Sequence, residues 1–233
     1  MNKRLPIAIL AGGMGTRISS ITQQLPKAMV SIAGEPFIAH QLKLLAHHKF
    51  TDVVICVGYH SEPLIDFVKE GSAFGLMVTY VHDGEKLLGT GGAIKAAFPV
   101  LSENFFVMYG DSYLRCDYAA VQKTYENSKK LGLMTVYKNH DQFDSSNVEY
   151  DGKMICHYNK KNKTPAMHYI DYGLNVFSKK AFLSFADRSE FDLAEVQEYL
   201  ASAHELSAYE AKERFYEIGS YDGIKALENK LLE

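Results

Sequence analysis

The alternation of short apolar runs with helical stretches constrains this chain more than any other feature. In the first half, runs such as "DVVICV" and "NFFVMY" are apolar at nearly every position, as in strands that are covered on both faces. Stretches with helical spacing separate them, including one from Pro36 to about His48. The pattern predicts an α/β fold, with a parallel sheet between helices.

The second half has shorter strands and reverse turns. Asp151-Gly152, inside "NVEYDGKMICHYN", is a strong hairpin signal, so we expect this half of the sheet to be more antiparallel. A strand-like "ERFYEIG" separates the helical "DLAEVQEYLAS" and "YDGIKALENKLL". We expect a single domain over residues 1–233, with two halves, 1–138 and 139–233.

Composition narrows the classes of partner and compartment. The net charge of −3 gives no basic field of the kind that binds nucleic acid or an anionic membrane. No window approaches a membrane helix, and the apolar part of "MNKRLPIAIL" is interrupted too early for a signal peptide. A cytoplasmic protein is therefore expected. The spacing of Cys56, Cys116 and Cys156 indicates neither disulfides nor a zinc site, and predicts reduced, buried thiols.

A glycine-rich turn, "LAGGMGTRI" from Leu10 to Ile18, follows the first predicted strand. It matches neither the P-loop nor the dinucleotide fingerprint. Without Cβ atoms, successive amide groups can form a concavity that suits phosphate oxygens. Arg17 and Lys27 place two cations near this turn, as a triphosphate would need. A purely structural turn is the alternative.

A second glycine cluster, "LLGTGGAIKAA", opens a predicted helix. Its residues Gly89, Thr90, Gly91 and Gly92 would present the free amide groups of a helix start to a ligand. A tight connection between strand and helix is the alternative.

The strand in "FFVMYGDSYL" delivers Asp111, beside Gly110, to its carboxyl end. Because a triphosphate arrives with Mg²⁺, a metal-binding carboxylate is favoured over a helix cap. Glu217 in "RFYEIGSYDG" is the best second metal ligand, and Asp222 is the fallback.

Five motifs in this order, "LAGGMGTRI", "LPKAM", "LGTGGA", "GDS" and "YEIGS", resemble those of the sugar-1-phosphate nucleotidyltransferases. The greatest likeness is to short bacterial members that make GDP-activated heptose or mannose. The resemblance implies a Rossmann-like mixed, mostly parallel sheet flanked by helices, the nucleotide-diphospho-sugar transferase fold. It also implies that an NTP and a sugar 1-phosphate give an NDP-sugar, a surface-polysaccharide precursor, and pyrophosphate, with Mg²⁺ as cofactor.

The resemblance carries roles to particular positions. Residues 1–138 would bind the nucleotide and residues 139–233 the sugar phosphate. Catalytic roles fall on Arg17, Lys27, Asp111 and Lys160, sugar-phosphate binding on Lys160, Gly173 and Asn175, and the metal on Asp111 and Glu217. The nucleotide would contact Leu10, Ala11, Gly12, Gly13, Gly15, Thr16, Arg17, Lys27, Gly89, Thr90, Gly91, Gly92, Gly110 and Asp111.

Three positions depart from the family pattern. Ala28 stands where Pro usually follows the lysine, Glu217 stands where Asp is usual, and Asn159 replaces the acid before Lys160. A solvated surface run of lysines is therefore the alternative for Lys160, and a non-catalytic nucleotide-sugar-binding subunit is the alternative function. A glycosyltransferase is disfavoured, because "DSY" lacks the second acid of a D-x-D metal motif. GTP is the first choice of nucleotide, before UTP and CTP, and homo-oligomerisation stays open.

Overall fold

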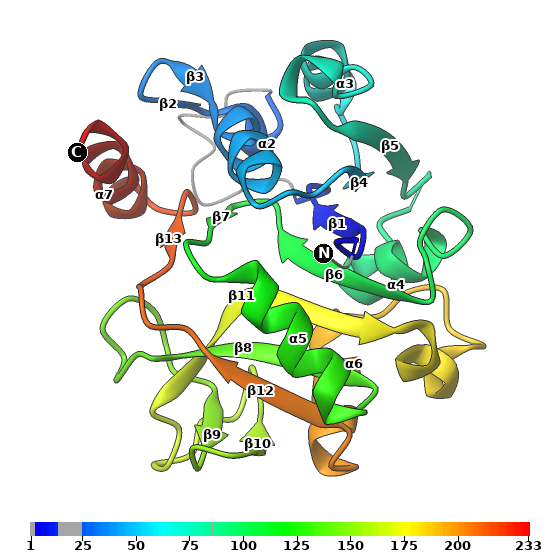
Figure 1. Ribbon diagram of the computed structural model, residues 1–233, viewed down its shortest axis with the longest axis vertical. Coiled ribbons are helices and arrows are strands. Elements are labelled where there is room, and N and C mark those ends of the chain that lie inside the picture. The colour runs from blue at the N-terminus through cyan, green and yellow to red at the C-terminus, as the bar shows by residue number, and fades with distance from the viewer. Residues whose placement is uncertain (1–2, 14–24, 85) are drawn as a thin grey trace.

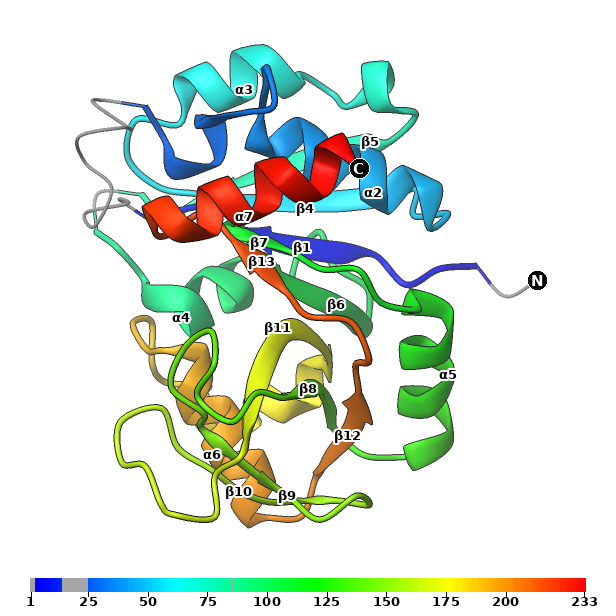
Figure 2. The same ribbon diagram turned by 90° about the vertical axis from the view of Figure 1, so that its left-hand side faces the viewer.

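A mixed β-sheet runs through both halves of the chain (Figures 1 and 2). The computed structural model describes residues 3–13, 25–84 and 86–233. The first half supplies four parallel strands in the order β5–β4–β1–β6, with bounds Met77–His82, Asp52–Val57, Ile7–Leu10 and Asn104–Tyr109. Their carboxyl ends meet at one edge, the place where open α/β sheets bind ligands.

The second half extends the same sheet beyond β6. Strand β11 (Tyr169–Ser178) runs antiparallel to β6 and to its next neighbour, β8 (Gly132–Lys138), and β12 (Leu206–Glu210) lies parallel to β8. The hairpin of β9 (Val148–Tyr150) and β10 (Ile155–Tyr158) joins one end of β11. The predicted mixed, mostly parallel sheet is confirmed, since β11 alone opposes the other described strands along the β5–β12 path.

Helices cover both faces of the sheet. Successive residues of β1 alternate between two buried clusters, with Ile7 and Ile9 in one and Ala8 in the other. The first cluster packs under α2 (Phe37–His47), α3 (Glu62–Val68) and α5 (Tyr118–Ser128). The second packs against α4 (Gly89–Ala96), α6 (Leu193–Ser202) and the 3₁₀ helix η4 (Lys179–Phe185). Two more 3₁₀ helices, η2 and η3, span Lys27–Met29 and Ser72–Phe74.

The end of the chain returns from the second half to the first (Figure 2). Strand β13 (Tyr216–Glu217) pairs with β7 (Ser112–Tyr113), directly after the end of β6. Helix α7 (Tyr221–Leu232), capped by the Ser220 hydroxyl, then packs beside the hairpin of β2 (Ser31–Ile32) and β3 (Glu35–Pro36). This return places Glu217 next to the loop that carries Asp111.

Most of the predicted elements are present. Pro36 precedes α2 as its N-cap, and Gly152 takes φ +92° in the turn between β9 and β10. The predicted strand "ERFYEIG" is only two residues long, because its partner β7 is equally short. The prediction of buried thiols is wrong for Cys156, which is exposed on the β10 strand.

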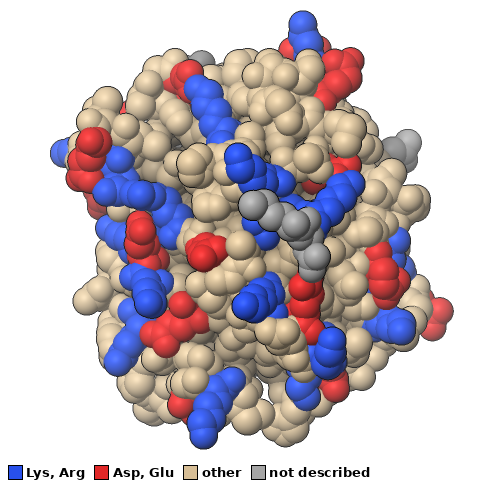
Figure 3. Space-filling model, viewed as in Figure 1, with Lys and Arg blue, Asp and Glu red and all other residues tan. Residues whose placement is uncertain are grey.

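The described surface carries both signs of charge. On the face shown in Figure 3, Lys and Arg are interspersed with Asp and Glu, and neither sign forms a continuous field among the residues drawn in colour. Within residues 3–13, 25–84 and 86–233, no helix has both the length and the apolar character that crossing a membrane requires.

Candidate active site

The carboxyl ends of β1 and β6 open onto a first cavity of about 290 Å³. Many of the residues predicted to bind a nucleotide lie together in its wall: Leu10, Ala11, Gly12, Gly13, Lys27, Gly89, Thr90, Gly110 and Asp111. The predicted Gly15, Thr16 and Arg17 lie outside the described residues. A cavity of this kind at the sheet edge can hold the base and ribose of a nucleotide.

Close backbone approach explains the glycines at the edge of the first cavity. The amide of Gly110 donates to the Leu10 carbonyl over 3.0 Å, and a Cβ on Gly110 would lie 2.6 Å from that oxygen. A Cβ on Gly58 would lie 2.9 Å from the Gly12 carbonyl oxygen. Around Gly13, no atom of the described residues other than its chain neighbours lies within 4 Å of such a Cβ, so the described part of the chain leaves room for a ligand there.

In the second glycine cluster, Gly91 and Gly92 do not present free amide groups to a ligand as predicted. The amides of Gly91 and Gly92 both donate to the Phe191 carbonyl, over 2.9 and 3.2 Å. A Cβ on either residue would overlap the segment 189–191. The prediction that these two amides are open to a ligand is therefore wrong: they seat the start of α4 against the loop before α6.

The Asp111 loop is held from two sides. Lys27 Nζ lies 2.7 Å from Asp111 Oδ2, and the Lys27 side chain is only 17% exposed. From α2, the buried Gln41 donates through Nε2 to the carbonyls of Tyr109 (3.1 Å) and Ser112 (2.8 Å). Gln41, a buried residue of α2, thus fixes the backbone on both sides of Asp111.

Lys27 is well placed without a proline at position 28. It begins the short helix η2, in which the Met29 amide donates to the Pro26 carbonyl over 2.8 Å. Ala28 is buried in this turn. The preceding Pro26 and the 3₁₀ turn fix the backbone here in the absence of a proline at position 28.

A second cavity, of about 600 Å³, adjoins the first. Lys27, Tyr109 and Asp111 line both cavities. The second half of the chain contributes three more predicted residues, Lys160, Gly173 and Glu217. It also contributes residues that the sequence analysis did not single out: Phe143, Asp144, Asn147, Tyr158, Asp171 and Phe215. The Lys27–Asp111 pair therefore stands where two ligands would meet.

Asp111 and Glu217 can serve a hard cation together. Their backbones are adjacent, because the Ile218 amide donates to the Asp111 carbonyl over 3.0 Å, and both line the second cavity. Glu217 accepts from the Ser220 hydroxyl (2.5 Å) and from the Gly219 amide, which leaves lone pairs on its two oxygens. Asp222 is exposed and belongs to neither cavity lining.

This donor set fits Mg²⁺. In the described parts of the chain, His, Cys, Asp and Glu nowhere form a group of three or more that could hold a metal ion. Magnesium is usually bound by one or two carboxylates together with substrate phosphates and water. Asp111, which lines both cavities, and its neighbour Glu217, which lines the second, meet that requirement.

Lys160 lines the second cavity, whereas its neighbours Lys161 and Lys163 do not. Its Nζ lies 3.1 Å from Asp192 Oδ2, at the second cavity. Asn159, which stands where an acid was expected, instead accepts from the amides of Lys161 and Asn162 in a turn. The acidic partner that the local sequence lacks is thus supplied from the N-cap of α6.

Behind Gly173, a polar network supports the second cavity. Gly173 lines it at φ +97°, but Asn175 is only 1% exposed and is absent from the lining. The prediction that Asn175 lines this cavity is wrong, because the side chain lies one layer deeper and donates to Asp171 (3.4 Å). Gln197 and the Gly173 amide also donate to Asp171, at 2.8 and 3.0 Å.

Two cavity carboxyls have raised pKa values. Burial raises the pKa of Asp171, although three hydrogen bonds to its carboxylate oppose that effect. In the first cavity, burial also raises the pKa of Asp83. Asp171 and Asp83 are therefore hydrogen-bond acceptors in the walls of the two cavities. Neither residue belongs to one of the five sequence motifs.

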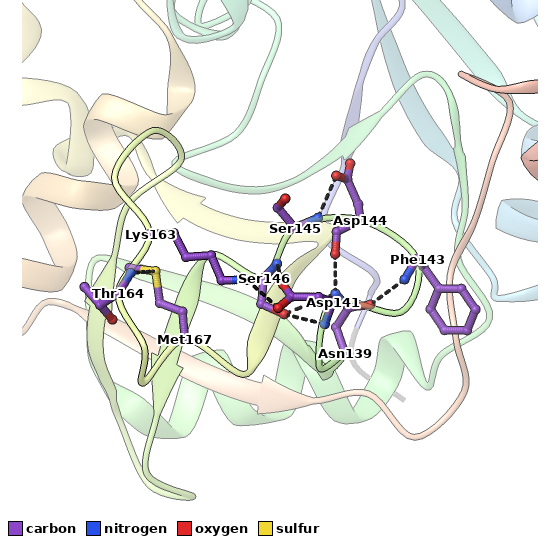
Figure 4. Close-up of polar contacts among 9 residues, drawn as sticks. All are labelled: Asn139, Asp141, Phe143, Asp144, Ser145, Ser146, Lys163, Thr164 and Met167. Atoms are coloured by element: carbon purple, nitrogen blue, oxygen red, sulfur yellow. Dashed lines mark hydrogen bonds and ion pairs between the residues drawn. The ribbon is translucent and has the colours of Figure 1, made fainter.

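The loop after β8 contributes Phe143, Asp144 and Asn147 to the lining of the second cavity, and Figure 4 shows polar contacts that hold this loop. The buried Asn139 donates to the Asp144 carbonyl and accepts from the Phe143 amide, and Asp141 accepts from the Ser146 amide over 2.8 Å. Lys163 pairs with the other Asp141 oxygen. The hydrogen bond from Lys163, with that from the Ser146 amide, lowers the pKa of Asp141 to about 2.

The first cavity is lined by glycines at the carboxyl edge of a mixed sheet, and the Lys27–Asp111 pair joins it to the second cavity. This arrangement defines a class of α/β domain with two adjoining ligand cavities. Residues 7–233 match the family model described as "Nucleotidyl transferase", and the chain belongs to this family.

Among curated relatives, the chain is similar to the D-glycero-alpha-D-manno-heptose 1-phosphate guanylyltransferase of Campylobacter jejuni, with 29% identity over 80% of this chain and 82% of that protein. It is 28% identical to the bifunctional protein GlmU of Methanococcus maripaludis over 96% of this chain, but spans only 54% of that relative's length.

Among solved structures, a putative glucose-1-phosphate thymidylyltransferase from Bacillus anthracis, in complex with a sucrose, superposes with a TM-score of 0.85. The match has 21% identity and covers 97% of this chain and 94% of that one. This likeness confirms the fold.

Proposed function

We propose that this protein transfers a nucleotidyl group from an NTP to a sugar 1-phosphate and releases pyrophosphate. The observation that carries the proposal is the pair of adjoining cavities that share Lys27 and Asp111. Residues 1–138 would hold the nucleotide and residues 139–233 the sugar phosphate, with Lys27 and Asp111 at the reacting groups. The five motifs and the family membership support the same reaction.

Charge neutralisation and alignment are the tasks of the site. A sugar phosphate is already an anion, so its oxygen needs no general base before it attacks the α-phosphorus. The attack brings two negatively charged groups together, and cations at the meeting point lower that cost. Lys27 would donate to the phosphates of the nucleotide from its position beside Asp111, Lys160 would bind the sugar phosphate, and Arg17 is the further cation that the motif supplies.

Asp111 and Glu217 would hold Mg²⁺. The ion would neutralise phosphate charge and orient the two reacting groups for in-line displacement. Asp111 is paired with Lys27 in the structure, so Lys27 and the metal would both compensate its charge when substrates are bound. The Glu217 carboxylate would stay anchored by Ser220.

The nucleotide would be GTP, and the position of Asp83 in the first cavity supports this choice. Asp83 reaches the wall beside Gly12, with one carboxylate oxygen 3.5 Å from the position of a Gly12 Cβ. Guanine presents two adjacent donors, N1–H and the 2-amino group, that match the two acceptor oxygens of a carboxylate. Uracil presents one N–H between two carbonyl oxygens, which a carboxylate would repel. The guanylyl specificity named for the Campylobacter relative supports the same choice.

The sugar phosphate would be of the heptose or mannose type, and the product would be a precursor of surface polysaccharide. The second cavity, with its Asp144, Asn147 and Asp171 side chains, offers acceptors for the many hydroxyl groups of such a sugar. The heptose 1-phosphate named for the Campylobacter relative supports this class of substrate.

Pyrophosphate release tests the proposal. The purified protein is incubated with Mg²⁺, each of GTP, UTP, CTP and ATP, and a panel of mannose, heptose, glucose and N-acetylglucosamine 1-phosphates. We expect release that requires both substrates and is fastest with GTP and a heptose or mannose phosphate. Binding of GTP and sugar phosphate without release from any pair would contradict the proposal and favour a non-catalytic binding subunit.

A further inference from the structure

Asp192 contacts residues from both cavities. Its Oδ1 accepts from the Thr90 hydroxyl (2.8 Å), and Thr90 lines the first cavity. Its Oδ2 accepts from Lys160 Nζ (3.1 Å), and Lys160 lines the second cavity. Asp192 itself belongs to neither lining. It therefore stands behind the two sites and connects a side chain of one to a side chain of the other.

The backbone holds Asp192 firmly at the wall of the first cavity. The Phe191 amide donates to the Leu88 carbonyl (3.0 Å), and the Leu193 amide donates to the Thr90 hydroxyl (2.8 Å). The Gly91 and Gly92 amides bind the Phe191 carbonyl as described above. Four hydrogen bonds thus lock residues 191–193 onto the start of α4 (Figure 2 shows α4 and α6 together).

Capping α6 accounts for only one of the two Asp192 oxygens. Oδ1 accepts from the Ala194 amide (3.0 Å), and Glu195 completes the capping box by accepting from the Asp192 amide (3.1 Å). Ser, Thr or Asn would cap a helix about as well as Asp. Compared with those residues, aspartate adds a negative charge, and its Oδ2 accepts from Lys160.

Lys160 needs such a partner because its side chain is long and exposed. About half of its side chain is open to solvent, and a free lysine loses considerable rotamer entropy when it is fixed by a ligand. A carboxylate that restricts the ammonium before the substrate arrives reduces that loss. The neighbouring Asn159 side chain is engaged with backbone amides and does not supply this restraint.

We propose that Asp192 is a positioning residue that holds the Lys160 ammonium at the sugar-phosphate cavity from an anchor on the wall of the nucleotide cavity. This inference rests on the proposed function of the two cavities. Asp192 contacts no substrate in this account and acts through Lys160 alone. Its removal should therefore weaken use of the sugar phosphate and leave the chemical step nearly unchanged.

The test is a double-mutant cycle on the steady-state constants. Asp192→Asn keeps a capping oxygen and an acceptor for Thr90 but removes the charge that faces Lys160. We expect it to raise the KM for sugar 1-phosphate about fivefold, in the range of a partly exposed ion pair, with little change in kcat or in the KM for GTP. In a Lys160→Met background, Asp192→Asn should cause no further change.

A matched control and a second measurement separate positioning from folding. Glu195→Gln removes the negative charge of the same capping box, which is paired with Arg188 at 2.7 Å, without touching Lys160. It should lower thermal stability only slightly, and the KM for sugar phosphate should stay as in wild type. Acylation of Lys160 by a lysine reagent, read by mass spectrometry without substrates, should be about threefold faster in Asp192→Asn and unchanged in Glu195→Gln.

The outcomes are distinct. An active wild-type protein whose KM for sugar phosphate is unaffected by Asp192→Asn, or whose KM rises equally in the Lys160→Met background, would overturn the positioning role alone. Unchanged Lys160 acylation in Asp192→Asn would overturn it as well. A wild-type protein that releases no pyrophosphate from any substrate pair would instead overturn the proposed function and, with it, this inference.

Discussion

Replacement of Asp111 by Asn separates catalysis from folding. Asn keeps an oxygen that can accept from Lys27, so the loop held by Gln41 should persist. The lost charge belongs to an ion pair at 2.7 Å whose two side chains are 17% and 39% exposed, and solvent screening limits such a pair to about 1 kcal/mol of stability. For a chain of this size that corresponds to a fall in Tm of about 2–4 °C.

The expected effect of Asp111→Asn on turnover is far larger. The variant would lose one of two carboxylates for Mg²⁺ and the anion that orients Lys27 where two phosphates meet. Electrostatic groups at such a centre are worth several kcal/mol of barrier, so kcat should fall about 10³-fold, which is ~4 kcal/mol.

Initial rates of pyrophosphate release and thermal unfolding curves measure both effects on the same protein samples. Asp222→Asn is the matched control, because this acid is exposed and lies outside both cavity linings. Its rate should equal that of wild type. A folded Asp111→Asn variant that turns over within threefold of wild type would refute the metal and orienting roles of Asp111.

Three further predictions address other parts of the molecule. Asp83→Asn should lower kcat/KM for GTP roughly 10- to 100-fold and leave that for UTP within about threefold, because charge-assisted hydrogen bonds to the guanine edge are lost; equal losses for both nucleotides would contradict base reading. Gly92→Ala should lower the free energy of unfolding by about 1–3 kcal/mol in denaturant unfolding, since the new Cβ would overlap the Ser189 carbonyl. A stabilised variant, as expected for a helical glycine with open space around it, would contradict this packing. The lowered pKa of Asp141, about 2 against an ordinary 3.8, stabilises the fold above pH 3.8, and this stabilisation is lost as pH falls toward 2. Asp141→Asn should therefore make acid unfolding shallower in that interval, and an unchanged slope would argue against the pair with Lys163.

Local signals explain what the sequence could predict. The glycines after β1 (Ile7–Gly13) and the acid after β6 (Asn104–Asp111) directly follow their strands in the sequence. A few consecutive residues therefore indicate which groups lie at the strand ends, where α/β sheets bind ligands. The parallel order of β1, β4 and β6 then brings these ends to one edge of the sheet. The first cavity was predictable for this reason.

Contacts between distant residues explain what the sequence could not predict. Lys160 and Asp192 are 32 positions apart, and Gln41 lies 71 positions before Ser112. No spacing rule connects such distant pairs. The sequence therefore did not indicate that Lys160, which lacks an acid directly before it, pairs with Asp192 at the start of α6. The prediction for Asn175 was wrong because proximity to Gly173 on the same strand does not show which residues reach the cavity. Gly173 lines the second cavity, whereas Asn175 is buried behind it.

The glycine cluster from Gly89 to Gly92 shows a different limit. Amides at a helix start can face a ligand or another part of the chain, and both uses select the same small residues. At Gly91 and Gly92 the partner is the Phe191 carbonyl.

A crystal structure with Mg²⁺, a non-hydrolysable GTP analogue and a sugar 1-phosphate would test the central claim most directly. The account predicts guanine beside Asp83, the sugar in the cavity lined by Gly173 and Lys160, and the two facing phosphates at Lys27 and Asp111. Triphosphate bound away from Lys27, or both ligands competing for one cavity, would contradict it.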